Sequence, residues 1–285
     1  MPRLIRDQDV DTDLPNRVND DQVTRDGLGF PLPGEASELD TAIHMFKISK
    51  ILGHTLESLY TTTRRRGAVV KITRLQAELD LWESAFLSNA TSNNDDDGAF
   101  DEVNDIENSF NKSFLAVLKC ITVFHVHRPA LTFSTTHNQF SISLKQCCHA
   151  SATLIDVISR TTHNTLISIY PNGLHILWQA GLTVLFAMWN GKPYSEDASS
   201  DQSLLILCIS TLRRFGNIGV RENDMVMECV DVLDRLQKRT FEGGELPEYD
   251  QWNIWDWPMT AAIELENNLS AVPLDLDFDS PINLQ

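Results

Sequence analysis

The sequence predicts an all-α protein, an irregular multi-helix domain with an acidic, flexible C-terminal tail. Several long segments carry apolar residues at every third or fourth position, which places side chains on one face of an α-helix. No segment alternates convincingly between apolar and polar residues, as a half-buried strand would. With 42% apolar residues, the 285-residue chain has enough material for a packed core. We expect three parts, residues 1–36, 37–240 and 241–285.

Residues 1–36 are predicted to form an extended acidic arm. Asp7, Asp9, Asp11 and Asp13 follow one another without helical spacing, and several glycines and prolines continue the segment up to Gly34. A disordered N-terminus is the alternative for such a composition.

Residues 37–240 are predicted to form a helical domain with a flexible loop near residues 90–105. Its first helix is capped by Ser37 or Asp40 and ends near Tyr60. The loop prediction follows from the run of Asn, Asp and Gly residues at its centre, which has no apolar face.

The second helix has an apolar seam with spacings of three and four, formed by Ile72, Leu75, Leu79, Trp82 and Phe86. The seam lasts only two heptads, so it predicts ordinary packing in preference to a coiled coil. Arg64-Arg65-Arg66 precedes this helix and is typical of a solvated turn, with a nuclear import signal as the alternative.

The central segment, Phe110 to Arg160, predicts two apolar helices joined by a short connection. Pro129 lacks an N–H and disfavours a helical residue before it, so the first helix should end near His127. Thr and Ser residues between Leu131 and Asn138 indicate the connection.

Three further helices are expected after this pair. Pro171 opens a helix that runs to Asn190 and is apolar nearly all round. It is about 18 residues long, the lower limit for a membrane span, and polar residues interrupt it, so a buried helix is predicted and no membrane contact is expected. Residues 204–215 and 225–236 predict the last two helices.

Charge and cysteine usage limit the classes of partner. The chain has 40 acidic and 23 basic residues and a net charge of −17, so phosphate backbones are repelled on average. Its five cysteines contain no C-x-x-C pair, which favours a reducing compartment.

The histidines and cysteines of the central segment suggest a zinc site as one alternative. His125 and His127 point in different directions on a helix, however, and the adjacent Cys147 and Cys148 are poorly placed to bind one ion. Core residues are therefore expected at these positions, and no metal ligands or cofactors are predicted.

No common hydrolase or nucleotide-binding motif is present, so no catalytic residues are predicted. The enzyme alternative is a terpene-synthase-like protein, in which Asp95-Asp96-Asp97 and Asn104-Asp105 would hold magnesium. Asn108 and Lys112 stand where the second motif requires serine and an acidic residue. A solvated acidic linker is the simpler interpretation.

Candidate contacts for an effector or partner lie in the helical domain. Large aromatic rings and a few polar groups are typical of a ligand site in a helical bundle, and we select His125, Arg128, Trp178 and Trp189. Ordinary core packing is the alternative for these residue types.

The tail, residues 241–285, is predicted to be an acidic activation segment. Nine acidic and no basic residues lie from Glu245 onward. Apolar side chains are interspersed among them and would remain available to a partner: Trp252, Trp255, Trp257, Leu274, Leu276 and Phe278. The alternative is a solvated tail whose tryptophans dock on the domain.

Taken in order, several segments resemble the regulatory domain of fungal zinc-cluster transcription factors, often called their middle homology region. Pro2-Arg3-Leu4-Ile5, Asp9, Asp11, Asp13 and Leu14-Pro15 resemble the family's "GRP-x-x-I, D-x-D, LP" segment. His127-Arg128-Pro129-Ala130-Leu131 resembles its "RP-x-L" helix end, and Cys147 with Ala150, Ala152 and Ile155 its "C-x-x-A-A" helix. The resemblance extends from about Pro2 to Gln237.

The resemblance implies a regulatory region of a nuclear transcription factor that is not an enzyme. Its implied partners are the transcriptional machinery or related transcription factors, and a small-molecule effector. The family's six-cysteine zinc cluster has no counterpart here, so the resemblance implies neither bound zinc nor direct DNA contact by this chain.

The chain also resembles a domain that is truncated at its N-terminus, because the family's first helices would precede Met1. Missing helices would expose apolar surface, which predicts a homo-oligomer or a poorly soluble protein. The alternative function is an oligomerising or inhibitory interaction protein that captures full-length relatives.

Overall fold

The computed structural model describes residues 12–16, 18, 23–25, 27–28, 39–60, 67–92, 102–160, 173–195, 198–216 and 224–242. Apart from one small hairpin, every element in these residues is a helix, which confirms the predicted all-α class. The hairpin pairs β1 (Val23–Thr24) with β2 (Gly27–Leu28) in antiparallel register, within the stretch expected to be an extended arm. The acidic tail lies outside the described residues.

The helices follow the predicted order along the chain. They are α1 (Asp40–Leu59), α2 (Ala68–Ser92), α3 (Glu102–His127), η3 (Arg128–Thr132, a 3-10 helix), α4 (Asn138–Arg160), α6 (Gly173–Trp189), α7 (Ala198–Gly216) and α8 (Asp224–Glu242). Helices α2 and α3 extend into both ends of the predicted loop at 90–105, because a helix that has already started adds further residues at little cost. Residues 93–101, including the aspartates at 95–97, lie outside the described residues.

Helix α3 ends at the predicted residue, and the chain then continues as η3. Pro129 has no N–H to donate and stands in the first turn of η3, a position that proline tolerates. The Gln139 N–H donates to Nδ1 of His137 at 3.0 Å, which supports the start of α4. The predicted connection between the two central helices is therefore a compact turn.

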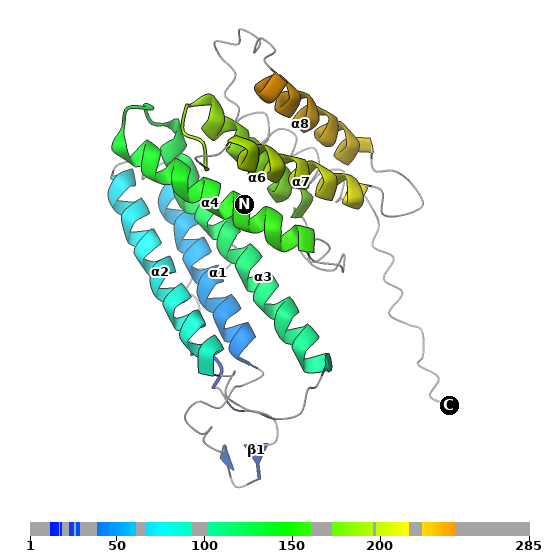
Figure 1. Ribbon diagram of the computed structural model, residues 1–285. Coiled ribbons are helices and arrows are strands. Elements are labelled where there is room, and N and C mark those ends of the chain that lie inside the picture. The colour runs from blue at the N-terminus through cyan, green and yellow to red at the C-terminus, as the bar shows by residue number, and fades with distance from the viewer. Residues whose placement is uncertain are drawn as a thin grey trace.

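Helix α4 is the centre of the fold (Figure 1). On one side it packs against α3, which in turn packs against α1, and α2 packs against α1. On the other side it packs against α6 and α7, and α8 contacts both of those. Helix α4 therefore lies between two groups of three helices, α1–α3 on one side and α6–α8 on the other.

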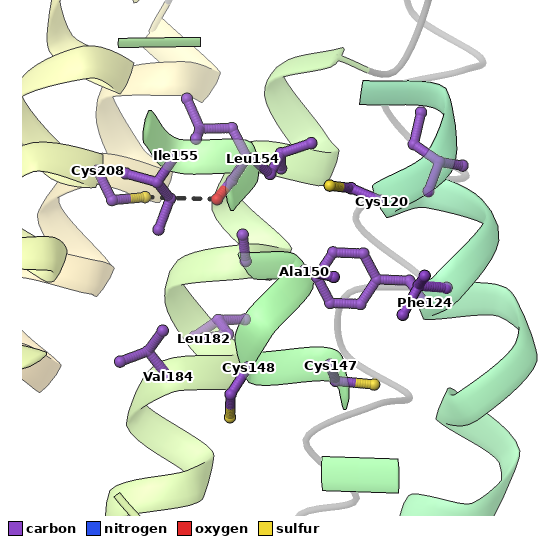
Figure 2. Packing of buried hydrophobic residues seen from close by; sticks show 14 of the residues in the cluster. Cys120, Phe124, Cys147, Cys148, Ala150, Leu154, Ile155, Leu182, Val184 and Cys208 are labelled. Atoms are coloured by element: carbon purple, nitrogen blue, oxygen red, sulfur yellow. Dashed lines mark hydrogen bonds between the residues drawn. The ribbon is translucent and has the colours of Figure 1, made fainter. Parts of the chain in front are cut away.

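The core follows α4 along its length. Leu144, Leu154 and Ile155 are at most 1% exposed, because the apolar positions of this helix face α3 on one side and α6 on the other. Figure 2 shows the Phe124 ring of α3 pointing toward Ala150 of α4. The heptad-like seam of α2 is buried at Ile72, Leu75, Leu79 and Trp82, as ordinary packing predicts.

Helix α6 is buried on most of its surface, as its apolar composition predicts. Within the described residues, the stretch Phe110–Thr132 is the one long and apolar enough to cross a membrane by length and composition, whereas α6 is shorter. In the fold, 67% of the most apolar window of that stretch is buried inside the protein, which is also what a central core helix would show.

Candidate functional site

Buried polar side chains gather where α3 ends and η3 begins. His127 is 1% exposed, and both of its ring nitrogens have partners. Nε2 lies 2.7 Å from Oε1 of Gln76 on α2, and Nδ1 lies 3.0 Å from Oγ of Ser143 on α4. One imidazole therefore joins three helices that are far apart in the sequence.

The neighbouring groups determine which nitrogen of His127 carries the proton. Gln76 donates its amide N–H to Asp80 at 2.6 Å, so its Oε1 is the acceptor for His127 Nε2–H. Nδ1 then accepts the Ser143 hydroxyl proton, and Ser143 Oγ accepts an N–H of Gln139 at 3.1 Å. We call this chain, Asp80, Gln76, His127, Ser143 and Gln139, the His127 network. Each of its groups has a partner of the right kind for a neutral imidazole.

Burial lowers the pKa of His127 from 6.5 to about 4, although the charge of Asp80 acts in the opposite direction. Between these two values the unfolded chain binds more protons than the folded one. The stability that neutral His127 contributes is therefore complete above pH 6.5 and is lost as the pH falls toward 4. A shift of this size corresponds to about 3 kcal/mol.

We therefore expect His127→Gln to flatten the pH dependence of stability. Urea unfolding gives the free energy of unfolding at pH 7.5 and at pH 4.5, and the difference between the two is the loss on acidification. This loss should be about 3 kcal/mol smaller in the variant than in the unchanged protein. Exposed His149 provides the matched control, His149→Gln. An equal loss on acidification in all three proteins would contradict the assignment.

A second group surrounds Arg128, the first residue of η3. The hydroxyl of Tyr60, the residue that follows α1, donates to the main-chain oxygen of His125 at 3.0 Å, and the two rings meet edge to face at 5.8 Å. Burial, and then the Arg128 charge, lower the pKa of His125 to about 4. Burial raises the pKa of Cys147 on α4, and Arg128 opposes this shift. We call Tyr60, His125, Arg128 and Cys147 the Arg128 corner.

The Arg128 corner contains one unusual atom. Nδ1 of His125 is buried and has no hydrogen-bond partner among the described residues. Buried polar atoms normally have a partner, so this nitrogen is an unused acceptor or donor beside a cation. The predicted contacts His125 and Arg128 are therefore neighbours at one helix junction.

The predicted contacts Trp178 and Trp189 lie elsewhere, on α6. Their indole N–H groups donate to α8, Trp178 to the carbonyl of Cys229 at 3.2 Å and Trp189 to Oγ1 of Thr240 at 3.0 Å. Residues 178 and 189, like residues 229 and 240, are about three helical turns apart. The two helices therefore run side by side in the same direction, and the two tryptophans hydrogen-bond α6 to α8 at both points.

The structure thus divides the four predicted residues between two places. His125 and Arg128 lie on the α3 side of α4, and Trp178 and Trp189 on its α6 side. The predicted tail residues from Trp252 to Phe278 lie outside the described residues. Sequence reasoning missed Gln76 and Ser143, although a serine between Phe140 and Leu144 on the buried face of α4 was a detectable signal of a polar partner.

The cysteines of the central segment are buried in separate places. Burial raises the pKa of Cys120 and of Cys148 to about 12, so neither thiol has the thiolate character that metal binding requires. Among the residues that the structure describes, no group of three or more His, Cys, Asp or Glu side chains could hold a metal ion. Figure 2 shows Cys147 and Cys148 on different sides of α4.

The chain is similar to the transcriptional activator protein acu-15 of Neurospora crassa. The two are 24% identical over 207 residues, which is 72% of this chain. The chain spans about a fifth of the relative's length, because the match covers 22% of it. No family model matches the chain, and no solved structure matches it.

Proposed function

We propose that this chain acts in transcriptional regulation, as a regulatory region of the kind found in fungal zinc-cluster transcription factors. The observation that carries the proposal is the similarity to a fungal transcriptional activator over 72% of the chain. The match spans several helices of the domain, as expected of a shared folded region and not of a short motif. We propose the nucleus as its location and the transcriptional machinery or related transcription factors as its partners.

The arrangement of polar groups supports binding in preference to catalysis. The His127 network ends on amide and carboxylate groups that hold helices together, and the His127 imidazole has a pKa of about 4, too low for a general base at neutral pH. The thiols of Cys120 and Cys148 have raised pKa values and are poor nucleophiles.

Within this proposal, the Arg128 corner is the place where an effector would act. It combines a cation, an unused ring nitrogen on His125 and Tyr60, a residue 42% exposed, and it brings the end of α1 together with α3 and α4. A ligand with a hydrogen-bonding anionic group has a complementary chemistry. Trp178 and Trp189 would not contact the effector, but their hydrogen bonds would keep α8 in place on α6.

We expect the whole chain to change transcription when it is fused to an unrelated DNA-binding domain. Reporter output should differ from that of the DNA-binding domain alone. Alanine at Leu274, Leu276 and Phe278, which keeps every charge of the tail, should reduce any activation. The unfused chain should not shift DNA at physiological salt, because its net charge is −17.

Several controls make this experiment decisive. Expression of every fusion is checked by immunoblot, and Arg128→Ala should alter reporter output by more than a stability-matched variant does, with the unfolding midpoint of each protein measured in parallel. No effect of the intact fusion on transcription would refute the regulatory function. Nanomolar DNA binding by the unfused chain would refute the proposed absence of DNA contact.

The alternative functions have separate outcomes. An inhibitory protein that captures relatives would be inactive as a fusion but would suppress a co-expressed full-length relative. A terpene-synthase-like enzyme would show a thermal shift with magnesium and diphosphate together. The similarity to a transcriptional activator favours neither of these over a regulatory region.

A further inference from the structure

The outer face of α2 is apolar and exposed, opposite the seam that packs against α1. Helix α2 lies at the edge of the fold (Figure 1), and Val70 and Leu81 on this face are each 73% exposed. Leu87 is 54% exposed. We call these side chains and their exposed neighbours the outer α2 face: Val69, Val70, Thr73, Arg74, Ala77, Asp80, Leu81, Ser84 and Leu87. On the side away from the core, helix α2 thus carries exposed apolar side chains among polar ones.

We propose that the outer α2 face binds the same face of a second copy of this chain, with the two helices antiparallel and their two-fold axis at Ala77. Val70, Ala77 and Ser84 recur every seven residues, which is the spacing of a helix–helix seam. Small side chains at the centre and at one end allow the two helices to approach closely. A two-fold pair uses one self-complementary patch twice, so a single face is sufficient.

The charges on this face select the antiparallel direction. A parallel two-fold pair would place Arg74 level with Arg74 and Asp80 level with Asp80, which brings like charges together. In the antiparallel pair, residues before Ala77 face residues after it. Arg74 of one copy then lies level with Asp80 of the other, so opposite charges share a level along the interface.

Arg74 is suited to this second contact. Its Nε donates to Glu78 Oε1 of its own helix at 3.0 Å, and its side chain is 77% exposed. The terminal N–H groups of a guanidinium extend beyond Nε and can reach a second carboxylate.

The apolar residues are complementary in the same register. In the antiparallel pair Val70 lies level with Ser84 of the second copy and Leu81 with Thr73, so each large apolar side chain meets a smaller one. These contacts remove from water the largest exposed apolar side chains of α2.

The size of the patch predicts weak association. A single pair of helices buries less than the roughly 1,200–2,000 Å² of a standard stable interface, so we expect a dissociation constant in the range of about 1–100 μM. Association should therefore depend on concentration across this range.

Sedimentation velocity of the whole chain over a concentration series tests the proposal. The unchanged protein should pass from monomer to dimer, and Leu81→Glu should remain monomeric through the same range, which is a loss of at least tenfold in affinity. Ile206, 53% exposed on α7, provides the matched control, and Ile206→Glu should associate as the unchanged protein does. A monomer at every concentration, or equal association of all three proteins, would overturn the proposal.

Cysteine crosslinking tests the direction of the helices. In the antiparallel pair, Ala77→Cys places two thiols at the two-fold axis, where mild oxidation should link two chains. Val70→Cys should not link to itself, because its counterpart lies at the other end of the interface, but it should link to Ser84→Cys when the two variants are mixed. Self-linking of all three variants would indicate a parallel pair, and no linking would indicate another occupant of this face; either result rejects the proposal.

Discussion

Replacing Gly181 by leucine is expected to lower the free energy of unfolding by about 3 kcal/mol. A Cβ at this position of α6 would lie 2.8 Å from Cδ2 of Leu233 on α8 and 3.1 Å from Sγ of Cys208 on α7. The Cys208 thiol also donates to the carbonyl of Leu177 at 3.4 Å, the dashed line in Figure 2. Three helices converge at this glycine, so any side chain there must push the Leu233 side chain aside.

A double-mutant cycle separates this close approach from helix propensity. Gly181→Ala alone adds a better helix former but a steric clash, and Leu233→Ala alone leaves a cavity that costs about 2–5 kcal/mol. The double variant should lose less stability than the sum of the two losses, because the smaller side chain at 233 makes room for the new methyl group. Urea unfolding of the four proteins measures the coupling, and additive losses would contradict the packing described here.

Asp201→Ala is expected to cost about 3 kcal/mol of folding stability. Asp201 stands in the first turn of α7 and is 0% exposed. Its Oδ2 accepts the Tyr194 N–H and its Oδ1 the Ser195 N–H, each at 3.1 Å. Truncation leaves both N–H groups without this acceptor and removes a carboxylate from a helix N-terminus, where negative charge is favourable.

Asp156→Ala is the matched control for this change. The Asp156 side chain is 45% exposed and pairs with Arg160 one turn later, so its removal should change stability by at most about 0.5 kcal/mol. Thermal and urea unfolding compare the two variants. Similar losses in both would mean that the buried carboxylate contributes no more than a surface ion pair.

Part of the site could be predicted from sequence because it depends on local rules. Pro129 ends α3 wherever the surrounding helices lie, so this one residue is sufficient to place His127 and Arg128 at a helix end. The prediction for α7 was less complete. The apolar spacing indicated a helix from residue 204, whereas α7 begins at Ala198, because its polar first turn is anchored by Asp201, whose carboxylate accepts the N–H groups of Tyr194 and Ser195 before the helix.

Partners across the core could not be predicted in the same way. Trp178 and Trp189 were selected as ligand contacts from their residue type, but which groups their indoles reach depends on the position of α8, about 50 residues later. Gln76 and Ser143 likewise acquire their roles only when α2 and α4 meet at His127. Hydrogen bonds between distant segments leave no periodic signal in either segment.

By itself, the sequence determined the helical class, the order of the helices and which face of each helix is buried, because apolar spacing and proline act within a few residues of the chain. Tertiary structure alone decided that α4 separates the two pairs of predicted contacts, that Leu233 and Cys208 crowd the position of Gly181 and that Asp201 is a buried acceptor. These features depend on which helices lie side by side, and packing of the whole core sets that arrangement.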